Sequence, residues 1–142
     1  MSDLTTSTPS QPTTASPATA SSDYSLRLAL TAVRVAAENR GQEIVLLDLR
    51  ELTSVFDYFV IVTGTSRRQL HAISEEIDRA VEVELADYRL GLEGYNESRW
   101  ILLDYGSVVI HLFDQEARQY YDLENLWGHA RRVDISSVLA TV

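Results

Sequence analysis

The sequence predicts a single α/β domain in which helices flank one mixed sheet of parallel and antiparallel strands. Two short apolar runs, 44–47 and 58–62, are rich in β-branched and aromatic residues, as expected of strands buried on both faces. A helical pattern over 66–85 follows the second run, and a strand, a helix and a strand in this order favour a crossover connection. The segment 100–113 has the pattern of a hairpin, which adds antiparallel strands. A chain of 142 residues has room for one such core.

The N-terminal residues 1–22 are nearly all Ser, Thr, Pro and Ala. Such a segment buries too little apolar surface to offset the entropy lost on ordering, so we expect a disordered leader. The domain itself is expected to span 23–128. Its first helix is predicted over 24–39, because apolar residues recur there at three- and four-residue spacing before Gly41. These apolar residues are Leu26, Leu30, Val33 and Ala37.

The two apolar runs are expected to be the central strands of the sheet. After the second run, the chain turns into a helix whose start has the spacing of a capping box, with Ser66 followed three residues later by Gln69. An apolar stripe continues this helix to about Leu85, while its other side is acidic, which is typical of a solvated face. The stripe contains Leu70, Ile73, Ile77, Ala80 and Val81, and the acidic side contains Glu75, Glu76, Asp78, Glu82 and Glu84.

The predicted hairpin places different chemistry on its two faces. Side chains alternate along strands, so a turn at 105–106 and a turn at 106–107 give the same partition. One face is wholly apolar, and the other mixes a tryptophan with polar residues that need partners. An aromatic residue ringed by polar ones is typical of protein interfaces, so the mixed face is a candidate docking surface. The alternative is that a helix or a loop simply covers the tryptophan. The apolar face carries Ile101, Leu103, Val108, Ile110 and Leu112, and the mixed face carries Trp100, Leu102, Asp104, Ser107, Val109 and His111.

A last helix is predicted over 115–127, with Asp114 as its N-cap and Gly128 as its end. Residues 129–142 are expected to form an extended tail. The expected apolar anchors of this helix are Ala117, Tyr120, Tyr121, Leu123, Leu126 and Trp127.

Composition narrows the class of partner. The formal charge of −9 argues against a sequence-independent grip on nucleic acid and suits a basic partner protein, so we expect no DNA binding. The chain has no cysteine, which excludes disulfides and cysteine-based zinc or nucleophile sites. No apolar stretch approaches the ~20 residues needed to span a bilayer, and the N-terminus lacks a signal-peptide pattern. We therefore expect a cytoplasmic protein without membrane contact.

Motifs for catalysis or cofactor binding are nearly absent. The turn from Thr63 to Arg68 precedes a helix, where free backbone N–H groups favour an anion, but the Gly-rich loop and the lysine of a nucleotide site are missing. A capped helix start is the favoured interpretation, and a nucleotide-binding or nucleotidyltransferase-like enzyme using this turn is the alternative. No Asp-x-Asp pair is present, Asp48 is a lone acid, and the three histidines lie in three different predicted elements. We expect no catalytic residue, no cofactor and no metal.

Several separated blocks closely resemble the ribosomal silencing factor family, also called Iojap-like. The resemblance covers about 25–128 and implies a mixed α/β fold related to nucleotidyltransferases but without their catalytic acids, in line with the missing Asp-x-Asp. The blocks are 57–66 (DYFVIVTGTS), 68–69 (RQ), 93–94 (EG), 100–106 (WILLDYG), 109–111 (VIH) and 121–127 (YDLENLW).

The resemblance also implies a function. Members of this family bind the large ribosomal subunit through its ribosomal protein number fourteen, on the surface that faces the small subunit, and so block subunit joining. Translation then falls when nutrients are short, by a steric mechanism that needs no chemistry. The tryptophan block places Trp100, Leu102, Asp104 and Tyr105 at or near the ribosomal contact, with Tyr105 expected at the turn tip and His111 as a further candidate.

The same resemblance implies an oligomeric state for the free protein and a cellular location. Family members are often homodimers when free, so a dimer is expected, and a minor contact with ribosomal RNA is left open. A bacterial cytosol is the expected location, with an organelle as the alternative. A third hypothesis is a purely self-associating module whose dimer buries Trp100.

Overall fold

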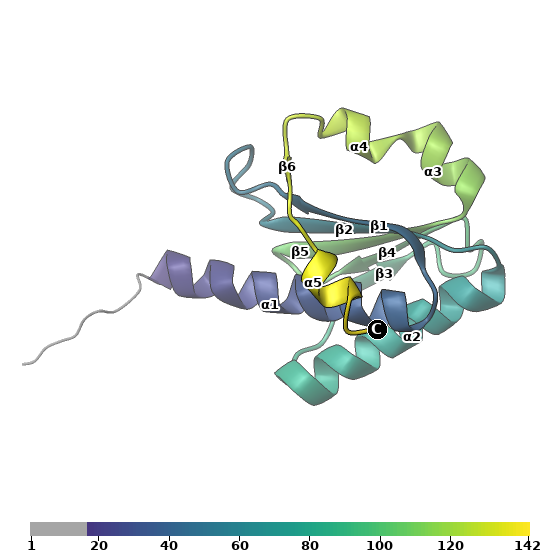
Figure 1. Cartoon of the computed structure of the whole chain (residues 1–142), viewed down its shortest axis with the longest axis horizontal. Coiled ribbons are helices and arrows are strands. Elements are labelled where there is room, and N and C mark those ends of the chain that lie inside the picture. Colours follow the sequence, from purple (N-terminus) through teal and green to yellow (C-terminus); the bar gives the residue numbers. More distant parts are fainter. Residues whose placement is uncertain (1–16) are drawn as a thin grey trace, which may run out of the picture.

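The computed structural model describes the backbone of residues 17–142 and the side chains of 21–142 (Figure 1). One six-stranded sheet runs in the order β3-β4-β5-β2-β1-β6, with helices on both of its faces. The prediction of a single mixed sheet flanked by helices is confirmed. The strands are β1 (Gln42–Asp48), β2 (Tyr58–Thr63), β3 (Gly91–Glu93), β4 (Trp100–Asp104), β5 (Val108–Phe113) and β6 (Arg131–Arg132).

Only β2 and β5 pair in parallel, and the other strand pairs are antiparallel. Every residue of β2 and β5 is buried, as expected of strands covered on both faces. The prediction that both early apolar runs are central holds for β2 but not for β1. The strand β1 lies second from the edge, and its first residues are exposed because only the two-residue β6 lies beyond it.

The helices α1 (Pro17–Glu38), α2 (Arg67–Leu85) and α5 (Ser136–Leu139) cover one face of the sheet. Small residues on α1 allow the helix to pack closely against the core, since Ala29, Ala32 and Ala36 are fully buried. The apolar hairpin face predicted from the sequence lies under these helices, with all five of its residues buried in the larger core cluster. This face is therefore structural.

The first helix begins at Pro17, earlier than the predicted start at residue 24 and inside the segment expected to be a disordered leader. The remaining leader, 1–16, lies outside the described residues. The helix ends as predicted just before Gly41, whose amide donates to the carbonyl of Ala36 at 2.8 Å. A Cβ at Gly41 would lie 2.7 Å from a Val62 methyl, so this glycine allows the chain to pass close to β2.

The predicted N-cap of α2 is confirmed. The hydroxyl of Ser66 accepts from the backbone N–H of Gln69 at 3.1 Å. The Gln69 side chain reaches back to the N–H of Thr65 at 2.6 Å, one residue before the position that a capping box uses. At the other end, Ala86 adopts a left-handed conformation that stops the helix after Leu85.

The opposite face of the sheet is covered by α3 (Gln115–Tyr121) and α4 (Leu123–Leu126). The single helix predicted over 115–127 is wrong, because the chain breaks at Asp122, which adopts a left-handed conformation with φ of 48°. The predicted cap is confirmed, since Asp114 accepts from the N–H of Ala117 at 2.7 Å. The break turns Leu123 toward the sheet and leaves Tyr120, Tyr121 and Leu126 exposed instead of in the core.

The C-terminal residues do not form an extended tail, so that prediction is wrong. The strand β6 pairs with β1, and the N–H of Val133 donates to the carbonyl of Leu46 at 2.9 Å. Beyond it, Ile135 and Val138 pack into the core cluster beside α1. The strand β6 and the helix α5 are too short to show a hydrophobic periodicity in the sequence. Burial of Ile135 and Val138 is what fixes their conformation.

The hairpin turn is formed by Gly106 and Ser107, one of the two turns that the sequence allows. The N–H of Tyr105 donates to the carbonyl of Val108 at 2.9 Å, which closes the turn. Gly106 has φ of +89°, a conformation that L-residues rarely adopt. The resulting register places Trp100 opposite Phe113 and Leu102 opposite His111.

Candidate functional site

The mixed face of the hairpin is a half-covered surface on the α3 side of the sheet. We call the residues Trp100, Leu102, Asp104, Val109 and His111 the tryptophan face. Trp100, Leu102 and Asp104 on β4 are half-buried, whereas Val109 and His111 on the central strand β5 are buried. The cover comes from α3, α4 and Trp127, which pack over β5 and β2 and leave β4 toward the rim. The alternative in which helices cover this face is therefore right for its β5 half, and docking on the β4 half stays a prediction.

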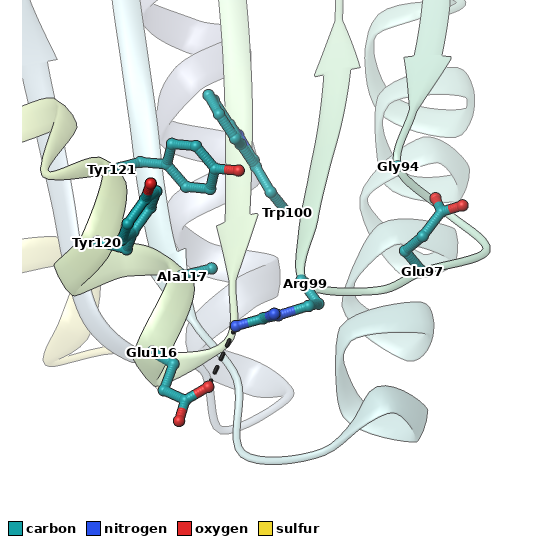
Figure 2. A pocket seen from close by; sticks show the side chains of 8 residues that line it. All are labelled: Gly94, Glu97, Arg99, Trp100, Glu116, Ala117, Tyr120 and Tyr121. Carbon is teal, nitrogen blue, oxygen red and sulfur yellow. Dashed lines mark hydrogen bonds and ion pairs between the residues drawn. The ribbon is translucent and has the colours of Figure 1, made fainter.

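Trp100 lies in a group of aromatic rings. Its ring centroid is 5.0 Å from that of Phe113 and 4.7 Å from that of Tyr121. Its indole Nε1 donates a hydrogen bond to Nδ1 of His111 at 3.1 Å. Figure 2 shows the indole between β4 and α3, with Tyr120 and Tyr121 on the helix beside it.

A groove opens next to Trp100, between α3 and the loop that joins β3 to β4 (Figure 2). Its volume is about 530 Å³. Tyr120 is 82% exposed and Tyr121 is 50% exposed, which is unusual for large aromatic side chains on one short helix. The groove is lined by Gly94, Glu97, Arg99, Trp100, Glu116, Ala117, Tyr120 and Tyr121.

Ion pairs connect the two sides of the groove. Arg99 contacts Asp114 at 3.4 Å and Glu116 at 3.1 Å, which links the start of β4 to the start of α3. Gly94 forms the opposite wall with φ of +75°, and a Cβ there would lie 1.9 Å from the carbonyl oxygen of Trp100. The backbone at Trp100 thus lies between a close glycine contact and the exposed ion pairs of Arg99.

His111 is too deeply placed to touch a partner. It is 3% exposed, and its ring centroid lies 4.5 Å from that of Phe59 in an edge-on arrangement. Burial lowers its pKa to about 3, so the imidazole is neutral near pH 7. Its Nε2 atom has no hydrogen-bond partner among the described residues. An unsatisfied buried polar group costs about 1–3 kcal/mol.

Tyr105 does not lie on the tryptophan face. The turn is formed by the two residues after it, so Tyr105 points to the opposite side of the sheet, where it is buried among residues of the larger core. Its hydroxyl donates to Asp78 of α2, and burial raises its pKa well above the usual range. The expectation of a contact residue at the turn tip is not supported by this position.

Asp104 has a local structural role. Its carboxylate accepts from the N–H of Gly106 at 2.8 Å and so stabilises the turn. Leu102 packs at the edge of the smaller core cluster beside Trp100. Of the five residues predicted for a contact, the structure brings Trp100, Leu102 and Asp104 together on an accessible strand.

Arg118 positions the helices that carry the tyrosines, and sequence reasoning missed it. It is 8% exposed, and its guanidinium donates to the carbonyl of Glu43 at 2.6 Å and to the hydroxyl of Thr63 at 2.9 Å. It also pairs with Glu124 at 3.0 Å, which lowers the pKa of that carboxyl. The sequence held one signal for this role: Arg118 directly follows Ala117, the first predicted apolar anchor of this helix.

In the turn from Thr63 to Arg68, the protein's own groups already use the N–H groups of Gly64 and Thr65. The N–H of Gly64 donates to the carbonyl of Phe113 at 2.9 Å, and the next N–H is taken by Gln69. A Cβ at Gly64 would lie 2.5 Å from a methyl carbon of Leu70, so this glycine serves packing. These contacts favour the capped helix start over the nucleotide-binding alternative.

The other candidate residues are held in structural contacts. The Asp48 carboxylate pairs with Arg50 at 2.7 Å and Arg131 at 3.1 Å, which holds its pKa well below the usual range. His71 contacts the carbonyl of Tyr95 at 2.8 Å. Over 17–142, no group of three or more His, Cys, Asp or Glu is arranged to hold a metal ion. In the same part of the chain, no helix combines the length and apolar character that crossing a membrane requires.

Comparison with known proteins assigns the family. The model of the family described as "Ribosomal silencing factor during starvation" matches residues 22–142. A ribosomal silencing factor of Bacillus subtilis is 41% identical over 99 residues, which are 69% of this chain and 82% of that protein. A crystal structure of a protein from Chromobacterium violaceum superposes with a TM-score of 0.70 at 33% identity, covering 73% of this chain and 86% of that one.

A longer relative adds a second context. The mouse protein named "Mitochondrial assembly of ribosomal large subunit protein 1" is 33% identical over 97 residues, and the match spans 67% of this chain and 42% of that protein. The match of the family model extends from α1 to the C-terminus, so it includes the tryptophan face, the groove and the ordered C-terminal elements. The chain therefore belongs to the ribosomal silencing factor family.

Proposed function

We propose that this protein is a translational repressor that binds the large ribosomal subunit through its ribosomal protein number fourteen and blocks joining of the small subunit. The contact surface is the exposed part of the tryptophan face, Trp100, Leu102 and Asp104, together with Tyr120 and Tyr121 across the groove. The mechanism is steric and takes place in the cytoplasm when nutrients are limiting. No bond is made or broken in it.

One observation carries this proposal: an exposed group of aromatic side chains surrounds a groove on the rim of the sheet. Trp and Tyr are enriched among the few residues that dominate protein interfaces, because they bury much area at little entropic cost. Tyr120 is 82% exposed, and its ring packs edge-on against Tyr121 at the rim of the groove. A partner that covers the groove would remove this apolar area from water.

Charge and family context support the same partner. The net charge of −9 favours a basic partner surface and disfavours a dominant contact with phosphates. The family description refers to silencing of ribosomes during starvation, and the mouse relative's name refers to the large subunit. We extend both to this chain as part of the proposal.

The test is cosedimentation with isolated large subunits, small subunits and joined ribosomes. We expect wild type to bind large subunits alone and to reduce the fraction of joined ribosomes. Trp100→Ala and Tyr120→Ala are expected to weaken binding by about tenfold or more, as for residues that dominate an interface. Binding of wild type to small subunits only, or to neither subunit, would overturn the proposal.

A matched control tests whether a loss of binding is specific to the groove or follows from removing any exposed aromatic side chain. Tyr88 is 66% exposed and lies beside β3, away from the groove. Tyr88→Ala should bind like wild type, while Tyr120→Ala binds weakly. Equal losses from both tyrosines would show that the contact does not centre on the groove. Circular dichroism of each variant checks that the fold is retained.

A further inference from the structure

The contact between Trp100 and His111 fixes the chemical state of the histidine. An indole N–H can only donate, so Nδ1 of His111 must accept the 3.1 Å hydrogen bond. The neutral imidazole then carries its proton on Nε2. That atom is buried and has no partner among the described residues. The ring therefore accepts the hydrogen bond from Trp100 while its own single N–H donor is left unpaired.

The surroundings of His111 are those of an apolar side chain. Phe59 packs edge-on against its ring at 4.5 Å, and Phe113 lies parallel to it at 6.3 Å between centroids. A phenylalanine at 111 would keep similar contacts and would remove the unpaired N–H donor at Nε2. What phenylalanine cannot do is accept the indole hydrogen bond. This hydrogen bond is the feature of the site that requires a histidine nitrogen.

Trp100 depends on this hydrogen bond for a fixed orientation. The indole is half-buried and packs in tilted arrangements against Phe113 and Tyr121, and the hydrogen bond to His111 is the contact that engages its N–H edge. We infer that His111 is a positioning residue, which holds the Trp100 indole in its docking orientation from beneath and does not itself touch the partner. This inference rests on the proposed function. It assigns to His111 an indirect role in place of the contact expected from the sequence.

A fixed indole favours docking for an entropic reason. A side chain that is already held in its bound orientation loses less freedom when a partner covers it. The bond to His111 spans two adjacent strands diagonally, so the orientation of Trp100 is set by the sheet itself. The docking surface is in this way ordered before the partner arrives.

The test uses His111→Phe and His111→Asn in the full chain carrying Trp127→Phe, which leaves Trp100 as the one tryptophan. His111→Phe removes the acceptor and the unpaired donor together. We expect its melting temperature to be no lower than that of the parent, its Trp100 emission and near-ultraviolet dichroism to change, and its binding to large subunits to weaken about fivefold. Asn places an oxygen near the position of Nδ1. His111→Asn should therefore restore the Trp100 spectrum and part of the binding, although its smaller side chain lowers the melting temperature.

A purely structural role predicts the opposite order. In that case His111→Phe binds within twofold of the parent and His111→Asn weakens binding in proportion to its lost stability, and this result would overturn the inference. Trp100→Phe provides a further check, because adding His111→Phe to it should weaken binding no further than Trp100→Phe alone. If the parent protein fails to bind large subunits, the proposed function fails. The Trp100 spectra then still show whether His111 orients the indole.

Discussion

At the scale of single residues, position in the hairpin distinguishes a residue that can contact a partner from residues that only support the fold. Trp100 and His111 are joined by a hydrogen bond on one face, and Tyr105 is bound to Asp78 on the other. All three side chains could hydrogen-bond to a partner according to the sequence. Burial decides between them, because a side chain with almost no exposed surface cannot touch a docked protein. Of these three side chains, only Trp100 is partly exposed.

Tyr105 gives a prediction at this scale. Tyr105→Phe removes the hydroxyl that donates to Asp78, while the ring remains in the core. We expect unfolding by urea to show a loss of about 1.5–3 kcal/mol in the free energy of unfolding, the usual net contribution of a hydrogen bond to a charged group. Affinity for large subunits should stay within twofold of wild type, because Tyr105 lies away from the tryptophan face. A loss of affinity without a loss of stability would return Tyr105 to the contact surface.

At the scale of elements, ion pairs in which one partner is buried, Arg118 or Asp48, hold the short C-terminal elements in place. Arg118 joins α3 to β1, β2 and α4, and Asp48 joins β1 to β6 through Arg131. Each piece is too short to be stable alone, since a helix of four to seven residues lies far below the length at which isolated helices persist. The orientation of Tyr120 and Tyr121 therefore depends on tertiary contacts of α3.

The Asp48 cluster predicts a dependence of stability on pH. Its two arginine partners, opposed by burial, hold the folded pKa below the ordinary value of 3.8. A depressed folded pKa means that the contribution is complete well above 3.8 and is lost as the pH falls through and below that value. Asp48→Asn should lower the free energy of unfolding by about 2 kcal/mol at pH 7. As the pH falls below 3, the wild type should lose this contribution, so that the free energies of unfolding of the two proteins converge. Urea unfolding of both proteins between pH 7 and pH 2 measures this difference. A difference that stays constant with pH would contradict the assigned role.

At the scale of the whole molecule, the tryptophan face offers a surface for a second copy as well as for the ribosome. Exposed aromatic side chains at the groove are the feature that both partners would cover. If the two surfaces overlap, a large subunit that binds only the monomer draws the protein out of the dimer by mass action. We propose that the free protein is a homodimer through this face.

The dimer hypothesis gives a prediction at this scale. Sedimentation velocity at micromolar concentration should show a dimer for wild type and a shift toward monomer for Trp100→Ala, because the indole is expected at the centre of both contacts. Tyr88→Ala serves as the control and should remain dimeric. A dimer that persists in Trp100→Ala would place self-association on another surface. A wild type that is monomeric at this concentration would refute the dimer.

The sequence by itself determined the parts of this protein that depend on local patterns. Alternation over 100–113 separated the two hairpin faces, the apolar run of β2 marked a central strand, and Ser66 and Asp114 marked two helix starts. Each of these follows from a period or a cap that a few neighbouring residues specify. The family resemblance rested partly on the same segments, 57–66 and 100–111.

Tertiary structure decided the rest, because burial depends on residues far apart in the chain. The break at Asp122, which exposes Tyr120, is held by Arg118 reaching the carbonyl of Glu43 on β1. Two-residue β6 and four-residue α5 are ordered by packing against β1 and α1, which no local period encodes. The candidate contact surface is thus predictable from the sequence at Trp100, Leu102 and Asp104. Its tyrosine half and the supporting role of His111 come only from how the sheet and helices pack.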